Sequence, residues 1–208
     1  MKNKIDKIIS KNKKKIIGRH NHKDFKRLFK KLFKDYHVKV NIVPILQNVS
    51  IDITTIGGGY DSEKDRIELD FFVTENENNT IIIPESFWSE FKFKFSQLMQ
   101  HELIHRQQSF SRDHLFDSKK YKVEKDEHGE REYLSDSDEI DAYSHDIALE
   151  IMKFYKKSSK FELFSKISRK KRLESLQIYN RAFKNTNWTQ IYKKLMKKTY
   201  KWTEYYGF

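Results

Sequence analysis

Two histidines and a glutamate stand at a spacing that suits zinc chemistry, because residues 101–105 read His-Glu-Leu-Ile-His, the pattern His-Glu-x-x-His. On a helix, residues four apart lie one turn apart on the same face, so His101 and His105 can reach one zinc ion. Glu102 lies one step round the helix and can act as general base on a zinc-bound water, whose pKa zinc lowers to about 7. The alternative is a buried helix whose two histidines only form local hydrogen bonds. The motif favours a hydrolytic zinc site.

A catalytic zinc takes three protein ligands and keeps one open position. A third histidine six residues after the second is excluded, because Ser111 stands there. His114 and His128 lie in a long polar segment and could reach the metal, although nothing in the sequence holds them in place. Glu139 is the better candidate, since it lies on the next predicted helix, whose acidic residues can face zinc while its isoleucines pack on the core. Ala142, one turn later, would allow the two helices to approach closely. The sequence therefore predicts Glu139 as the third ligand.

Hydrophobic periodicity predicts the elements that must position these residues. Residues 24–36 keep a helical repeat of apolar side chains. A long polar connection occupies 109–134, and Ser135 with Asp138 resembles a capping box that opens the glutamate helix. Alternating residues predict strands at 38–43, 49–53, 66–73 and 80–83, a glycine turn or loop at 57–59, the His-Glu-x-x-His helix at about 86–108, and one or two C-terminal helices. The predicted fold class is α+β, with an N-terminal helix, a small mixed sheet of about four strands, and helices after it.

Charge is distributed in three blocks. Residues 1–40 hold 15 Lys and Arg against 3 acidic residues, residues 41–157 hold 14 against 24, and residues 158–208 hold 13 against 3. We expect a basic tail at 1–20 and a single domain at 21–208, with a basic helical extension from about 158. The basic flanks, including the runs 13–15 and 170–171, could contact nucleic acid or an acidic partner. Solvent-exposed lysine is the simpler interpretation, and the C-terminal Trp and Tyr residues are expected mainly to pack the last helix.

Other composition features exclude several classes. The chain has no cysteine, so disulfides and Cys-type zinc sites are excluded. No apolar run approaches the roughly 20 residues of a membrane span, and the N-terminus lacks the apolar core of a signal peptide. We therefore expect a cytoplasmic protein without membrane partners.

The residues His101-Glu102-Leu103-Ile104-His105 and, downstream, Glu139-Ile140-Asp141-Ala142 resemble the gluzincin branch of zinc metallopeptidases, which has a thermolysin-like ligand set. The chain is also similar to short metallopeptidase-like proteins of AT-rich bacteriophages, which would place it in the host cytoplasm or the virion. The resemblance covers about residues 66–155. It implies a minimal zincin-like fold, with Glu139 as third ligand and the strand at 66–73 as the edge that pairs with an extended substrate.

The chain departs from the gluzincin pattern at one position. Tyr143 stands where that pattern has an Asp bonded to a zinc ligand. Three acidic residues could orient a ligand instead, and four residues could stabilise the oxyanion of the transition state. The acidic candidates are Asp138, Asp141 and Asp146, and the oxyanion candidates are His145, Tyr133, Arg131 and His128.

These observations together predict a zinc metalloendopeptidase. Its ligands would be His101, His105 and Glu139, its base Glu102, its cofactor Zn²⁺, and its substrate a peptide or protein. A narrow-specificity processing or host-directed protease suits a chain of this size best. The alternative is a basic nucleic-acid-associated protein with a structural or inactive zinc site, and steep salt dependence of nucleic-acid binding would distinguish it.

Overall fold

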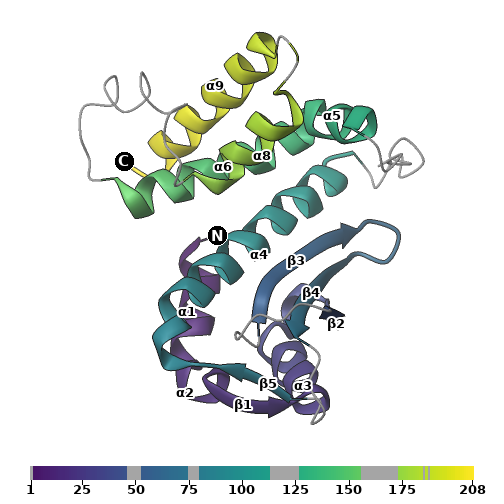
Figure 1. Ribbon diagram of the computed structural model, residues 1–208, viewed down its shortest axis with the longest axis vertical. Coiled ribbons are helices and arrows are strands. Elements are labelled where there is room, and N and C mark those ends of the chain that lie inside the picture. Colours follow the sequence, from purple (N-terminus) through teal and green to yellow (C-terminus); the bar gives the residue numbers. More distant parts are fainter. Residues whose placement is uncertain are drawn as a thin grey trace. The chain divides into compact units, whose positions relative to one another are not determined.

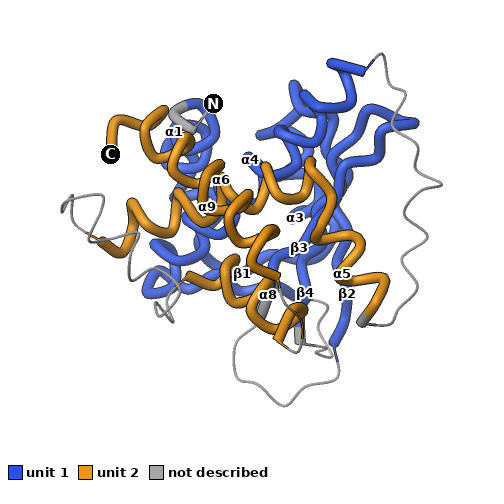
Figure 2. Tube along the Cα trace, turned by 90° about the horizontal axis from the view of Figure 1, so that it is seen from above, with its two compact units in different colours: residues 1–114 blue, residues 115–208 orange. Residues whose placement is uncertain are grey.

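The computed structural model has an α+β fold that divides into two compact units, Met1–His114 and Leu115–Phe208 (Figure 2). It describes residues 2–45, 53–74, 80–112, 127–155, 173–184, 186 and 188–208. The sequence predicted one domain from residue 21 onward, whereas the chain packs as two units that each include their own helices and core. Within the described residues, no helix combines the length and apolar character needed to cross a membrane.

Unit 1 contains all of the described strands, packed with helices (Figure 1). One three-stranded sheet has the order β2-β4-β3, in which β2 is parallel and β3 antiparallel to β4, and β1 pairs with β5 in a separate antiparallel ribbon. The elements are α1 (Lys2–Lys11), α2 (Lys13–Ile16), β1 (Gly18–Asn21), α3 (His22–Leu32), η1 (Lys34–Tyr36), β2 (Val38–Ile45), β3 (Ile53–Asp61), β4 (Arg66–Thr74), β5 (Thr80–Ile83), η2 (Glu85–Phe87) and α4 (Trp88–Phe110).

The strand at 66–73 occupies a different place from the one predicted. This strand, β4, is hydrogen-bonded on both sides, to β2 and to β3, so it is the centre of the sheet and cannot be the edge that pairs with a substrate. The predicted strand 80–83 exists as β5 but pairs with β1, which the sequence did not indicate. The single four-stranded sheet of the prediction is therefore replaced by a sheet of three strands and a ribbon of two.

The glycine run at 57–59 lies inside β3 and does not form the predicted turn. A Cβ atom on Gly58 would lie 2.5 Å from the carbonyl oxygen of Glu68 and 3.4 Å from Leu98 of α4, whereas nothing lies within 4 Å of a Cβ on Gly59. Gly58 therefore lets β3 pass close to both its neighbouring strand and α4. The predicted strand at 49–53 lies mostly outside the described residues.

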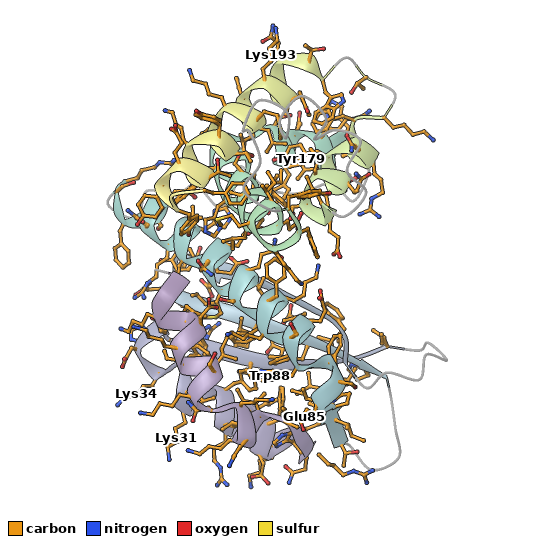
Figure 3. All side chains as sticks on the ribbon, turned by 90° about the vertical axis from the view of Figure 1, so that its left-hand side faces the viewer. Lys31, Lys34, Glu85, Trp88, Tyr179 and Lys193 are labelled. Atoms are coloured by element: carbon orange, nitrogen blue, oxygen red, sulfur yellow. The ribbon has the colours of Figure 1, made fainter. Side chains whose placement is uncertain are left out.

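Two separate cores stabilise the two units; Trp88 packs against the core of unit 1, and Tyr179 is buried in the core of unit 2 (Figure 3). In unit 1, phenylalanines from α3, β4 and α4 pack against one another, as their periodicity predicted. Three isoleucines of α1 and α2 are also fully buried there, so residues 1–20 are not a tail separate from the domain. The buried aromatic residues of this core are Phe25, Phe29, Phe33, Phe71, Phe91 and Phe95.

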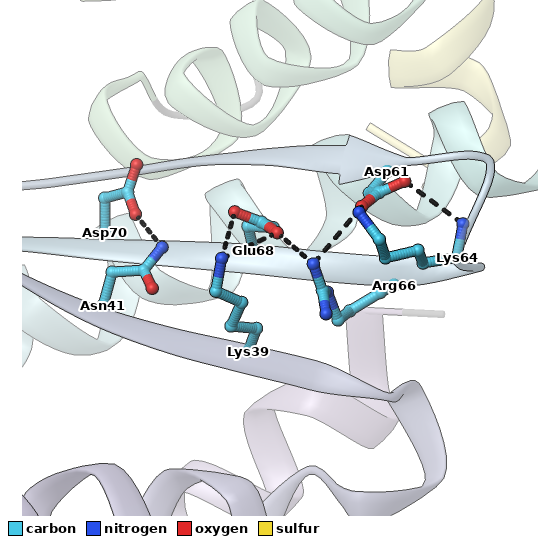
Figure 4. Close-up of polar contacts among 7 residues, drawn as sticks. All are labelled: Lys39, Asn41, Asp61, Lys64, Arg66, Glu68 and Asp70. Carbon is cyan, nitrogen blue, oxygen red and sulfur yellow. Dashed lines mark hydrogen bonds and ion pairs between the residues drawn. The ribbon is translucent and has the colours of Figure 1, made fainter.

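The other face of the three-stranded sheet is polar. Side chains alternate along β4, so Ile67, Leu69, Phe71 and Val73 are buried while Arg66, Glu68 and Asp70 are directed away from that core. Figure 4 shows their cross-strand ladder. It contains hydrogen bonds between Lys39 and Glu68 at 3.1 Å, Asn41 and Asp70 at 2.7 Å, and Arg66 and Asp61 at 3.3 Å.

Unit 2 is helical in its described part. Its elements are α5 (Glu127–Ser135), α6 (Ser137–Phe154), α8 (Glu174–Ala182) and α9 (Thr189–Tyr205). The N-cap of α6 is Asp136, whose side chain accepts from the backbone N–H of Asp138, and not Ser135 as predicted. α5 likewise occupies part of the predicted polar connection. The predicted stripe Ile140, Ile147 and Ile151 is buried against α8 and α9, as expected.

Candidate metal centre

α4 carries both predicted histidine ligands on a helix of 23 residues. Neither Gly nor Pro interrupts it, and Phe91, Phe95 and Met99 are fully buried in the core of unit 1. Because this apolar stripe fixes the rotation of the helix about its axis, it also fixes the direction in which His101 and His105 point.

The two imidazoles turn the same nitrogen towards one point. The Nε2 atoms of His101 and His105 are 3.1 Å apart, and the ring planes meet at 67°. Two nitrogens bound to zinc at about 2.0–2.1 Å and a tetrahedral angle lie about 3.3 Å apart, so the pair fits one shared ion. The same distance also fits a hydrogen bond in which Nε2 of His101 donates to Nε2 of His105.

Gln108 fixes which nitrogen of His105 can bind a metal. The amide oxygen Oε1 of Gln108 is 2.9 Å from Nδ1 of His105. Because that oxygen can only accept, Nδ1 carries the proton and Nε2 keeps its lone pair for a metal. A partner of this kind orients metal-binding histidines in general. The sequence reasoning did not identify Gln108, although its spacing of three residues from His105 places both on one helix face.

An ion pair anchors the end of α4 that carries His105. Arg106 donates two hydrogen bonds to Asp65, with Nε–Oδ1 at 2.7 Å and Nη2–Oδ2 at 2.6 Å, and the Tyr60 hydroxyl donates to the same carboxylate at 3.0 Å. The hydrogen bonds from Arg106 hold the pKa of Asp65 below its usual value. Asp65 has a positive φ of 42°, a conformation that Asp tolerates better than most residues. The β3–β4 turn is thereby fastened to α4.

A second network anchors α4 one turn before His101. The Ser96 hydroxyl donates to Asp6 of α1, and Nε2 of Gln100 donates to the Ser96 carbonyl oxygen at 2.9 Å. α1 therefore contributes a partly buried polar contact to the helix that carries the histidines, in addition to its isoleucines. Residues 1–20, which the sequence predicted as a tail, therefore help to position the helix that carries the two histidines.

The predicted base and the predicted third ligand are both buried. Glu102 is 4% exposed on α4 in unit 1. Glu139 is 6% exposed in the first turn of α6 in unit 2. Asp136 begins that helix and the isoleucine stripe fixes its rotation, so the direction of Glu139 is determined within its own unit.

The other residues that the sequence offered as metal ligands, or as carboxylates that orient a ligand, have different surroundings. His114 lies outside the described residues. His128 is exposed on α5, with Nδ1 3.5 Å from Glu132. Asp141 accepts a hydrogen bond from Nε1 of Trp202 at 3.3 Å and pairs with Lys198, so it holds α9 on α6. Asp138 and Asp146 are both buried, at 5% and 6% exposed, and remain the candidates for orienting a ligand.

The predicted oxyanion donors lie on two different helices, His145 on α6 and the other three on α5. His145 is 2% exposed, and its Nε2 forms a hydrogen bond with the Tyr206 hydroxyl at 2.8 Å. Its ring also packs on Trp202, so His145 has a structural role in joining α6 to α9. Arg131 and Tyr133 are partly buried on α5.

Tyr179 of α8 is a residue that sequence reasoning missed. It is fully buried, and its hydroxyl has no hydrogen-bond partner among the residues that the structure describes. Burial raises the pKa of Tyr179, and the charge of Glu139 adds to the effect. A neutral phenol therefore lies in the electrostatic range of the predicted third ligand. Nothing in the sequence distinguishes this tyrosine from its apolar neighbours.

Comparisons with protein-family models, with curated proteins and with solved structures find no match to this chain. The resemblance to gluzincins therefore depends on the chain's own residues.

Proposed function

We propose that this chain is a zinc-dependent metallopeptidase in which His101, His105 and Glu139 bind the metal and Glu102 is the general base. The observation that carries the proposal is the convergence of two Nε2 atoms 3.1 Å apart, with a buried glutamate next to the first histidine. Two histidines and one glutamate are also the donor set of many catalytic zinc sites, and these three residues could together hold a metal ion.

Each proposed residue has a defined task. When bound, zinc would activate water and polarise the scissile carbonyl. Glu102 takes the proton of the attacking water and passes it to the leaving amine, a role for which a buried carboxylate beside the ligands is suited. Gln108 keeps His105 in the required tautomer, and the Arg106–Asp65 pair holds the end of the helix. The proposal requires unit 2 to supply Glu139 to the histidine pair of unit 1.

The substrate edge in this proposal is β3. Within the described residues β3 pairs with β4 alone, so its other edge is free for the backbone of an extended peptide. The three glycines leave that backbone without side chains over residues 57–59. A narrow-specificity processing or host-directed protease is the form of the activity that we favour.

The test compares zinc content and peptide hydrolysis in matched variants. We expect about one zinc per wild-type chain and loss of at least about tenfold in affinity for His101→Ala and Glu139→Gln. His128→Ala is the control, since His128 is exposed on α5, and it should keep the metal. Glu102→Gln should keep zinc and lose at least about 100-fold in hydrolysis of a peptide library.

Two outcomes would contradict the proposal. If wild type folds and binds no zinc, the histidines form only their local hydrogen bond. If Glu102→Gln keeps both zinc and the wild-type rate, Glu102 is not the base. Circular dichroism on each variant separates loss of metal from loss of fold.

A further inference from the structure

The N-terminal helices of unit 1 each have one apolar and one basic stripe. Ile5, Ile9 and Ile16 of α1 and α2 are fully buried, as are the phenylalanines of α3. The opposite stripes carry exposed lysines. We call six of these the basic face: Lys7, Lys11 and Lys14 on α1 and α2, and Lys30, Lys31 and Lys34 on α3 and η1.

The two helical parts of the basic face belong to one side of unit 1. Nζ of Lys4, at the start of α1, lies 5.5 Å from the ring of Tyr36, the last residue of η1. Figure 3 shows Lys31 and Lys34 pointing outward on the side where α1 lies. The start of α1 therefore lies beside η1, which carries the last lysine of the basic face.

The lysines of the basic face carry charges that the fold does not neutralise. Within the described residues none of the six forms an ion pair, whereas the sheet pairs Lys39 with Glu68 and Arg66 with Asp61 (Figure 4). Residues 1–40 hold only 3 acidic residues, so few local carboxylates exist to pair with. Concentrated cations of this kind raise the local potential and attract polyanions.

We propose that the basic face binds double-stranded nucleic acid through its phosphate backbone, without sequence specificity. Lysine contacts phosphate as a point charge and reads bases poorly, so the six lysines suit backbone contact. The exposed large apolar residues of the described chain are Phe110, Tyr200 and Tyr205, none of which lies on α1–α3. The face thus has neither aromatic side chains for stacking on single strands nor apolar ones for inserting into a membrane. It also lacks the exposed aromatic anchors typical of protein interfaces, and the one exposed arginine of α3, Arg27, pairs with Asp24 at 3.1 Å.

The size of the effect follows from counterion release. If all six lysines contact phosphates, the logarithm of the binding constant falls with the logarithm of salt concentration with a slope of about −5. The binding is independent of the metal site, because no residue of the basic face takes part in it.

The experiment measures fluorescence anisotropy of a labelled duplex of about 20 base pairs with the full chain over a salt series. The test variant is Lys7→Gln/Lys11→Gln/Lys31→Gln/Lys34→Gln. The matched control removes four exposed lysines of α9 in unit 2, as Lys193→Gln/Lys194→Gln/Lys197→Gln/Lys201→Gln, with the same change in net charge. We expect the test variant to lose at least about tenfold in affinity and its slope to fall to about −2. The control should stay within about threefold of wild type, and zinc content should not change in either variant.

Several outcomes would overturn the proposal. Absence of duplex binding at low salt does so, and so does equal loss in both variants, which would show an effect of net charge alone. Tighter binding to polyglutamate, to single strands, or to phosphatidylserine–phosphatidylcholine vesicles than to duplex would assign the face to another partner. Duplex binding by a wild-type chain that takes up no zinc, by contrast, would contradict only the proposed peptidase.

Discussion

The two units bury polar side chains in different ways. In unit 1, the buried polar residues of the described chain all lie on α4, while the rest of the core is apolar and rich in phenylalanine. In unit 2, buried polar residues spread over α6, α8 and α9 and bind across helices, for example Ser144 to the carbonyl oxygen of Leu195 at 3.0 Å and His145 to Tyr206 at 2.8 Å.

This difference shows which interactions each unit depends on. The core of unit 1 is stabilised by packing of aromatic rings, and its charged ladders lie on the outer face of the sheet. Unit 2 relies on specific buried hydrogen bonds, each costly to leave unmade. The buried polar groups of both units are nevertheless densest on α4 and α6, the helices that carry the proposed ligands.

The largest expected loss of stability comes from removing the buried carboxylate of Glu150. Its oxygens accept from the backbone N–H of Ser175 at 3.2 Å and from the Ser175 hydroxyl at 2.8 Å, at the start of α8. Glu150→Leu leaves both donors unpaired, so we expect a loss of about 2–3 kcal/mol in the free energy of unfolding, measured with urea. Glu174→Gln, at the exposed neighbour, should cost less than about 0.5 kcal/mol. Equal costs would contradict the dependence of unit 2 on this contact.

The glycine pair in β3 sharpens the comparison for unit 1. Gly58→Ala places a methyl group against the Glu68 carbonyl oxygen and Leu98, so we expect destabilisation of about 1–3 kcal/mol. Gly59→Ala meets nothing within 4 Å and should be neutral or slightly stabilising. Thermal unfolding measures both. If Gly58→Ala is as stable as Gly59→Ala, β3 does not pass α4 as closely as described.

The Arg106–Asp65 pair predicts a dependence on pH. Because the pKa of Asp65 is depressed in the fold, its stabilising contribution is present above its unfolded pKa of about 3.9 and is lost as the pH falls through the lower folded value. We expect Asp65→Asn to cost about 1–2 kcal/mol at neutral pH, and the cost to disappear as the pH falls through the folded pKa of Asp65. Glu63→Gln in the same turn is the control. A cost that stays constant with pH would show that the charge of Asp65 is unimportant.

The smallest expected changes in stability come from removing one tyrosine hydroxyl in each unit. The Tyr60 hydroxyl donates to Asp65, so Tyr60→Phe should lose about 1 kcal/mol. The Tyr179 hydroxyl is buried without a partner in the described chain, so Tyr179→Phe should be neutral or gain up to about 1 kcal/mol. Loss of stability in Tyr179→Phe would show that the hydroxyl has a partner. Loss of peptidase activity alone, with stability kept, would indicate contact with the substrate.

Periodicity predicted the elements whose apolar stripes face one core. The stripes of α3, α4 and α6 were all identified, because burial of Phe29, Phe95 or Ile147 leaves a repeat that is visible in the sequence. The pair His101 and His105 was also predictable, since helix geometry alone brings residues four apart together.

Features that depend on long-range contact could not be predicted in the same way. The pairing of β1 with β5 joins residues about sixty positions apart, and the glycine run forms a strand because it pairs with β4. The cap of α6 is Asp136 and not Ser135. The sequence could not distinguish them, because Ser and Asp are both suitable N-cap residues. The partners Asp65 and Arg106 are forty-one residues apart and carry no sequence signal.

The central claim is that the histidine pair of α4 and the glutamate of α6 bind one zinc ion. X-ray absorption at the zinc edge of the full chain tests it most directly, because it counts imidazole ligands and measures their distances. We predict two imidazole nitrogens and additional oxygen ligands at about 2.0–2.1 Å. His105→Ala and Glu139→Gln should both lose zinc, while His128→Ala gives the wild-type spectrum. A chain that takes up no zinc, or a spectrum with three imidazoles unchanged by Glu139→Gln, would contradict the account.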